Sequence, residues 1–242
     1  MRFALFFAFI LFVSAPVMAE TKDPVFLLGQ DESLLHISAT ERREVDQDLL
    51  IATLRIEVES EDNKKVQNDI NTAMAKALEL AKPYADVKAI TRGYNVHQYD
   101  KNGSKRDLPR RMVWKGSQSV ELKSKNAEKL LELAGKIQSA GFIMGGLEYT
   151  LSPEVAAQIQ DEMLEAALEK LQNRAQRAAK ALGKSTATLK DIDTQGNYAP
   201  EPRATLNSAN FSMMASKEMA APVASPGETT LSMTVNAKAL LR

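Results

Sequence analysis

Residues 48–58, Asp-Leu-Leu-Ile-Ala-Thr-Leu-Arg-Ile-Glu-Val, carry the clearest structural signal of this chain. Apolar and polar side chains alternate along and just beyond this segment. The apolar positions are Ala52, Leu54, Ile56 and Val58, and the polar positions are Thr53, Arg55, Glu57 and Glu59. A period of two predicts a strand with one buried and one solvated face, as in an antiparallel sheet. Residues 34–44 alternate similarly, so we expect a hairpin-like pair with residues 49–60.

Working outward from this strand, helical and strand periods follow one another along the chain. Helices are predicted at residues 61–82, 127–137 and 153–182, and further strands at 87–99, 110–123, 147–151, 187–194 and 231–239. Ser152, Pro153 and Gly183 mark the ends of the longest helix as N-cap, first helical residue and C-terminal stop. The order ββαββαβαββ predicts an α+β fold, with three helices packed on a mostly antiparallel sheet.

The N-terminus predicts export. Arg2 precedes the apolar run Phe3–Val13, and a small-residue site ends at Ala19. This pattern is typical of a signal peptide cleaved between Ala19 and Glu20. The alternative is an uncleaved anchor, but the apolar run is shorter than the roughly twenty residues that a membrane span needs. Because the cleavage site has no Cys to carry a lipid, we expect a soluble periplasmic protein rather than a lipoprotein.

The chain is then expected to have three parts: a signal peptide at 1–19, which is removed, a polar leader at 20–33 and one domain at 34–242. A Pro-rich segment without pattern, residues 196–227, predicts a long flexible loop within that domain. The full chain balances 31 Lys and Arg against 31 Asp and Glu, which argues against a nucleic-acid partner. It also has no Cys, which excludes disulfides, thiol nucleophiles and Cys-ligated zinc.

The sequence contains no recognisable catalytic or metal-binding motif. His36 and His97 are the two histidines, and each falls at a polar-facing strand position outside any ligand pattern. No metalloprotease, nucleophile-elbow, P-loop or dinucleotide-binding motif occurs. We therefore expect a protein that is not an enzyme, with no catalytic residue and no cofactor.

Basic residues gather around the Asn102-Gly103 turn between residues 87–99 and 110–123, which predicts a long hairpin with a charged tip. The candidates for docking are Lys101, Lys105, Arg106, Arg110 and Arg111. Two interpretations stay open. The charges keep an exposed loop soluble, or they dock an acidic envelope protein or a membrane surface.

Three methionines in the patternless segment, Met213, Met214 and Met219, offer an alternative function. Thioethers are soft ligands for Cu(I) and are reversibly oxidised. The segment contains no His to complete a copper site. Soft-metal binding or oxidant handling is therefore kept as the second hypothesis.

The assembled pattern resembles the SIMPL-domain family of bacterial periplasmic proteins, from about residue 34 to the C-terminus. The segments that carry the resemblance are Leu35–Thr40, residues 48–58, Gln118–Leu122, Ala175–Gly183, Asn197–Pro200 and Pro226-Gly-Glu with the strand after it. One departure lies at Glu41–Asp48, where family members often have Gly and Pro-Asp.

The resemblance implies an α+β domain exported to the periplasm, with ring-like or channel-like oligomers in some members. It supplies no catalytic residues to carry over. Some members are named for oxidative-stress defence, so an indirect part in stress tolerance is implied. We accordingly expect a homo-oligomer or a binder of envelope partners.

Overall fold

The computed structural model describes residues 29, 31–103, 109–194 and 224–242. Its helices and strands follow the predicted order, which confirms the α+β class. They are β1 (Ser33–Asp46), β2 (Leu49–Ser60), α1 (Asn63–Ala81), β3 (Lys88–Asp100), β4 (Met112–Ser124), α2 (Ala127–Ser139), β5 (Ile143–Thr150), α3 (Pro153–Ala181), β6 (Ala187–Asp193) and β7 (Glu228–Leu241).

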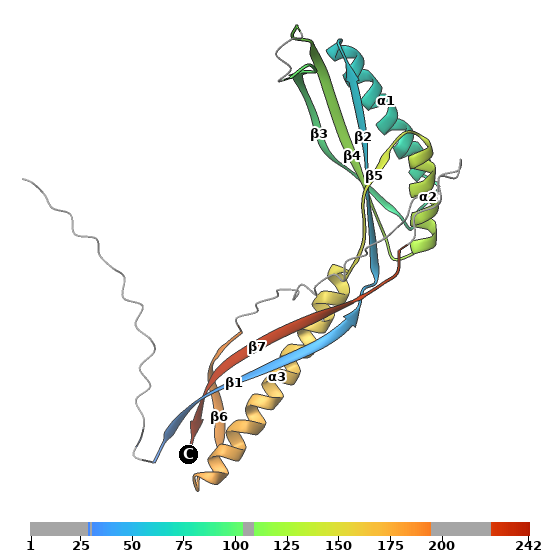
Figure 1. Ribbon diagram of the computed structural model, residues 1–242. Helices are drawn as coiled ribbons and strands as arrows, with labels where there is room; N and C mark the ends of the chain where they lie inside the picture. Colours follow the sequence, from blue (N-terminus) through green and yellow to red (C-terminus); the bar gives the residue numbers. More distant parts are fainter. Residues whose placement is uncertain (1–28, 30, 104–108, 195–223) are drawn as a thin grey trace, which may run out of the picture.

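The described strands form two antiparallel sheets where the alternation alone suggested one. One sheet has the order β3-β4-β2-β5, and the other has the order β1-β7-β6. Figure 1 shows an elongated molecule in which the sheets lie end to end. We call the part made of β2, α1, β3, β4, α2 and β5 the four-stranded half. The three-stranded half comprises β1, α3, β6 and β7.

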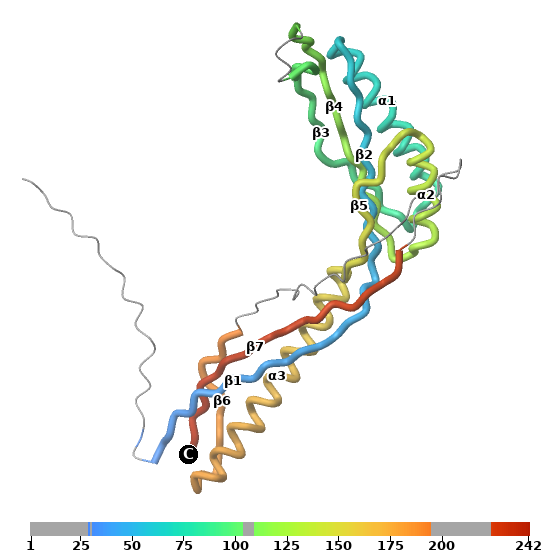
Figure 2. The backbone as a smooth tube through the Cα atoms, in the orientation of Figure 1, coloured from blue at the N-terminus to red at the C-terminus, as the bar shows by residue number. Residues whose placement is uncertain are grey.

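The expected hairpin of residues 34–44 with 49–60 is wrong. β1 pairs along its length with β7, from Ser33 opposite Leu241 to Asp46 opposite Glu228. β2 instead lies between β4 and β5. The connecting residues, Gln47 and Asp48, include no Gly and no Asn-Gly pair, which tight hairpin turns favour because they need positive φ. The chain therefore continues forward from β1 into β2, as the tube in Figure 2 shows.

The four-stranded half buries the apolar face that the alternation in β2 predicted. Leu50, Ala52 and Leu54 are fully buried there. Helices α1 and α2 cover this face, with Ile70 and Leu130 among the buried residues of the same core. By contrast, Arg55 and Glu57 of β2 are exposed on the opposite face.

The three-stranded half packs α3 against one face of its sheet. Ala167 and Leu171 of the helix meet Ala39, Val235 and Ala237 of β1 and β7. Small side chains dominate this contact, so the helix lies close to the sheet. Gly183 ends the helix as predicted, with φ +68° and the Lys184 N–H donating to the Ala179 carbonyl at 2.8 Å.

The two halves meet where Asp48 accepts hydrogen bonds from Ser152. The Ser152 backbone N–H and hydroxyl donate to the two oxygens of the Asp48 carboxylate, each at 2.7 Å. Lys125, which follows β4, forms an ion pair with the same carboxylate at 2.7 Å. Nearby, the Gln47 N–H donates to the Gly227 carbonyl at 2.9 Å and its side-chain amide to Thr229 at 3.1 Å. The predicted N-cap, Ser152, therefore also joins the halves.

Charge matters at this junction. Partial burial by itself raises the pKa of Asp48, but the hydrogen bonds from Lys125 and Ser152 outweigh it and lower the pKa to about 2. The carboxylate is thus held in its charged form in the folded protein. Because the unfolded chain takes up the proton first as pH falls, this contribution to stability is present above about pH 4 and is lost toward pH 2.

Replacing Asp48 tests the junction. Asp48→Asn removes the ion pair and one acceptor, so we expect the free energy of unfolding to fall by about 1–2 kcal/mol at pH 7. Urea denaturation at several pH values measures the free energy of unfolding. The difference between the variant and the wild type should narrow between about pH 4 and pH 2. Asp193→Asn, at an exposed position, is the matched control. A gap that does not change with pH would contradict the role of the charge.

A second prediction concerns Gly116 in β4, over which α1 packs directly. A Cβ at this position would come within 2.5 Å of Val66 Cγ1 and closer still to Ile70 Cδ1. Gly116→Ala is therefore expected to destabilise the fold by about 1–3 kcal/mol. Gly135→Ala, inside α2 with nothing within 4 Å of the new Cβ, should instead stabilise it by about 0.5–1 kcal/mol. Thermal denaturation that ranks the two variants in the opposite order would refute the packing argument.

Candidate functional site

Helices cover only one face of each sheet, and the other face is polar (Figure 1). The two histidines lie on these open faces. His36 is exposed on β1 in the three-stranded half, and His97 is exposed on β3 in the four-stranded half. The prediction that both occupy polar-facing strand positions is confirmed. Each lines a shallow groove, and these grooves are the candidate sites.

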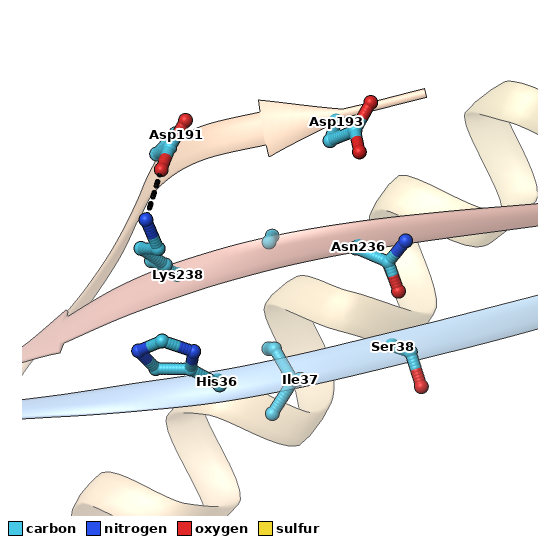
Figure 3. Close-up of a pocket in the computed structure, with 8 residues that line it drawn as sticks. His36, Ile37, Ser38, Asp191, Asp193, Asn236 and Lys238 are labelled. Atoms are coloured by element: carbon cyan, nitrogen blue, oxygen red, sulfur yellow. Dashed lines mark ion pairs between the residues drawn. The ribbon is translucent and has the colours of Figure 1, made fainter. Parts of the chain in front are cut away.

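The His36 groove, of about 610 Å³, crosses all three strands of its sheet. Its polar side chains are His36 and Ser38 from β1, Asn236 and Lys238 from β7, and Asp191 and Asp193 from β6. Figure 3 shows Asp191 and Lys238 pointing toward each other, and their Oδ2 and Nζ atoms are 2.6 Å apart. Asp191 has φ +47° at a shift of register between β6 and β7. This bulge directs the carboxylate to Lys238.

The groove combines an imidazole, two carboxylates, an ammonium and an amide on an open surface. Such a set can hydrogen-bond a polar or zwitterionic group without enclosing it. Within the described ranges, no three His, Asp or Glu side chains are placed to hold a metal ion. Sequence patterns did not predict this groove, because β6 and β1 are far apart in the chain and meet only through β7.

A second groove surrounds His97 on the open face of the four-stranded half. Its lining includes Arg55, Tyr94, Asn95 and Ser117. Arg55 donates to the Ser117 hydroxyl at 2.9 Å, and His97 Nδ1 lies 3.1 Å from the Asn95 side-chain oxygen. At this level β3 shifts register, and Tyr94 is 47% exposed.

The signal that could have indicated this irregularity is Gly93, which lies inside a strand pattern. Its φ is +50°, a conformation that L residues rarely adopt. An isolated glycine of this kind marks a bulge.

The basic hairpin forms as predicted, with β3 antiparallel to β4, and its tip lies at one end of the molecule (Figure 1). Its charge is partly balanced by acids that sequence reasoning did not assign to it. Lys101 pairs with Glu59, and Arg111 pairs with Glu61 at 2.9 Å. The hydrogen bond from Lys101, together with one from Tyr99, lowers the pKa of Glu59.

Two further residues of this hairpin, Trp114 and Arg110, differ in their exposure to solvent. Trp114 is partly buried against the core of the four-stranded half. Arg110 is exposed. Because Lys101 and Arg111 are paired with Glu59 and Glu61, the described part of the tip is closer to neutral than the run of basic residues suggested.

Several predicted positions lie outside the described residues. They are Ala19, Glu20, Lys105, Arg106, Met213, Met214 and Met219, together with most of the 196–227 loop. Among the helices that the structure describes, none has the length and apolar character needed to cross a membrane.

Comparison with solved structures gives ten matching chains. One is a putative amidohydrolase/peptidase from Burkholderia cenocepacia, at 12% identity and a TM-score of 0.22. The match covers 60% of this chain and 34% of that one, so this chain corresponds to about a third of its length. Such a low TM-score supports no conclusion about fold or activity. A search of curated proteins finds no significant match.

The family comparison is decisive. The model of the SIMPL family, described as a protein of unknown function (DUF541), matches residues 35–239. That range begins in β1 and ends in β7, so it includes both sheets and all three described helices. The chain belongs to the SIMPL family.

Proposed function

We propose that this chain is an exported, periplasmic SIMPL-domain protein that is not an enzyme. It acts by self-assembly or by binding partners in the cell envelope, and its part in oxidative-stress tolerance is indirect. The observation that carries this proposal is the division of the molecule into two sheets, each open on one face. This shape offers extended surfaces, and its grooves are shallow.

Unpaired strand edges support a role in assembly. β1 and β6 are the edges of one sheet, and β3 and β5 are the edges of the other. Edge strands present free N–H and C=O groups, to which another chain can add. On the β1 edge the Arg174 guanidinium donates to the Ser38 carbonyl, and Arg43 pairs with Glu162 at 2.6 Å. Because these side chains of α3 contact the β1 edge, the edges at β3, β5 and β6 and the open sheet faces are better placed to bind a partner.

Export is supported by the sequence of residues 1–19. The lack of Cys is compatible with export, since a fold without disulfides rests on packing in any redox compartment. The predicted docking residues are Lys101, Lys105, Arg106, Arg110 and Arg111. We propose that they recognise an acidic envelope protein or the membrane surface. With Lys101 and Arg111 already paired to Glu59 and Glu61, such contacts would be weak and sensitive to salt.

Native mass spectrometry of the protein purified from a periplasmic extract tests both parts of the proposal. The mature subunit is expected to begin at Glu20, with the mass of residues 1–19 missing, and to form an oligomer at micromolar concentration. Ala19→Arg should block cleavage and leave the full-length mass, because the site needs a small residue. An intact N-terminus in the wild type would refute export by cleavage, and a strict monomer would refute self-assembly.

The alternative function, soft-metal or oxidant handling, rests on the closeness of Met213, Met214 and Met219 in the chain. If these thioethers form a site, replacing all three with Leu should weaken Cu(I) binding by at least about tenfold, since thioether sulfur is the soft ligand. Competition with a coloured Cu(I) chelator measures the affinity. Met74→Leu, a buried substitution in α1, is the control. Equal affinity in the triple variant and the wild type would remove this alternative.

A further inference from the structure

The last turns of α3 carry a face of basic side chains. Its cations follow one another at spacings of three and four residues: Lys170, Arg174, Arg177 and Lys180. At about 100° per residue, these four lie within about 120° of one another around the helix axis. The buried residues of the same turns are centred on the opposite side, against the sheet: Leu171, Ala175 and Ala179. The basic face therefore points away from the sheet.

A hollow of about 690 Å³ lies along this face. Its lining consists of the four cations together with Asn173 and Gln176, so it contains no acidic and no apolar side chain. Interfaces between proteins have an apolar centre and are depleted in lysine. A face made of cations and amides suits an anionic surface that is bound through charge.

Two of the four cations contact β1. Lys170 pairs with Glu41 at 2.6 Å, which balances its charge. Arg174 donates to the Ser38 carbonyl, which is an uncharged acceptor, so the positive charge of Arg174 remains.

The other two cations have no partner of opposite charge among the described residues, since none of these forms an ion pair with Arg177 or Lys180. The helix dipole favours a cation in the last turn, such as Lys180, but this effect does not extend to Arg177, which lies before that turn. At the basic hairpin tip, by contrast, Lys101 and Arg111 are paired with acids. The end of α3 therefore carries the less compensated positive charge.

The acids of α3 are turned away from the basic face. Glu162 is partly buried and pairs with Arg43 at 2.6 Å. The exposed acids point at least about 80° away from the middle of the basic face, and all of them precede Lys170: Glu154, Asp161, Glu165 and Glu169. Even the last of these lies about 20 Å along the axis from the end of the helix, roughly two Debye lengths at 0.1 M salt. An anionic surface at that end is therefore attracted with little opposing repulsion.

This end of α3 also lies at one end of the elongated molecule, remote from α1 and α2 (Figure 1). Leu182, which follows the helix directly, is 60% exposed there. Lys184 donates to the Asp31 carbonyl and so adds a further positive charge. Glu32 pairs with Arg242 at 2.7 Å, which balances both charges. An exposed apolar side chain among cations is typical of segments that bind at a membrane interface.

We propose that this end of α3 docks the protein on an anionic phospholipid surface. The cations attract the negatively charged surface, and the guanidinium groups of Arg174 and Arg177 bind headgroup phosphates. Leu182 lies on the end of the helix and not on its side, so it enters the boundary between headgroups and acyl chains when the helix approaches end first. The docking rests on the envelope-partner part of the proposed function, and it makes phospholipid that partner.

Vesicle flotation of the mature protein, residues 20–242, tests this docking. At about 20 mM salt the wild type should bind vesicles of phosphatidylglycerol mixed with phosphatidylcholine, and it should not bind phosphatidylcholine alone. Arg177→Glu with Lys180→Glu should weaken binding at least about tenfold, since each cation near an anionic membrane contributes about fivefold. Leu182→Ser should weaken binding by about threefold to tenfold, because it removes the apolar contact.

Controls separate this face from folding and from overall charge. Lys64→Glu with Lys76→Glu, at exposed positions of α1, makes the same change in net charge as the α3 double variant and should bind like the wild type. Circular dichroism checks that each variant is folded. Raising the salt to about 0.5 M should release the wild type from the vesicles, because it screens exposed charges. A fluorescent polyglutamate peptide serves as the probe for an acidic protein partner.

Four results would overturn the inference. If the wild type does not bind phosphatidylglycerol vesicles although native mass spectrometry shows cleavage and assembly, the docking is wrong and the rest of the proposed function stands. If the α1 double variant loses binding as strongly as the α3 double variant, net charge is responsible and not this face. If Leu182→Ser binds as well as the wild type, the end-first approach is wrong. If the wild type binds polyglutamate but not the vesicles, the face serves an acidic protein.

Discussion

The hydrogen bonds between Asp48 and Ser152 hold together the two places where the chain passes between its halves. It leaves the three-stranded half at Gln47 and Asp48, and it returns at Leu151 and Ser152. One carboxylate accepts from the backbone and side chain of the returning residue, while Lys125 balances its charge. Apolar contacts add to this link, because Leu151 is buried with Ala156 and Leu231, and Ala224 packs against the core of the four-stranded half. The low pKa of Asp48 keeps the link charged across ordinary pH values.

This arrangement determines which surfaces remain available. In each half the helices pack on one face of the sheet. The opposite faces are polar and open, and they carry the His36 and His97 grooves. The elongated shape also leaves α3 exposed along one side. Surfaces of this kind suit contacts with other chains better than the enclosure of a small substrate. The proposed function follows from that division.

Much of the fold was predictable because its signals are local. The period-two pattern of β2 identified its buried face, and Ser152 and Gly183 identified the limits of α3. The hairpin of β3 with β4 followed from the Asn102-Gly103 turn. Each of these depends on residues within a few positions of one another. The candidate grooves were not predictable in the same way, since their side chains come from strands that meet only in the sheet.

Local alternation along β1 and β2 specified two strands, a buried side for each and the α+β class, because side-chain direction along a strand depends on the residue order alone. Which strand each one pairs with depends on the whole chain. Because Gln47 and Asp48 do not form a tight turn, β1 does not fold back on β2. It pairs instead with β7, almost two hundred residues away in the chain. The separation into two sheets, the balancing of Lys101 and Arg111 by Glu59 and Glu61, and the junction at Asp48 all arise from contacts between distant segments. Only the tertiary structure could determine them, because packing and not local periodicity selects such partners.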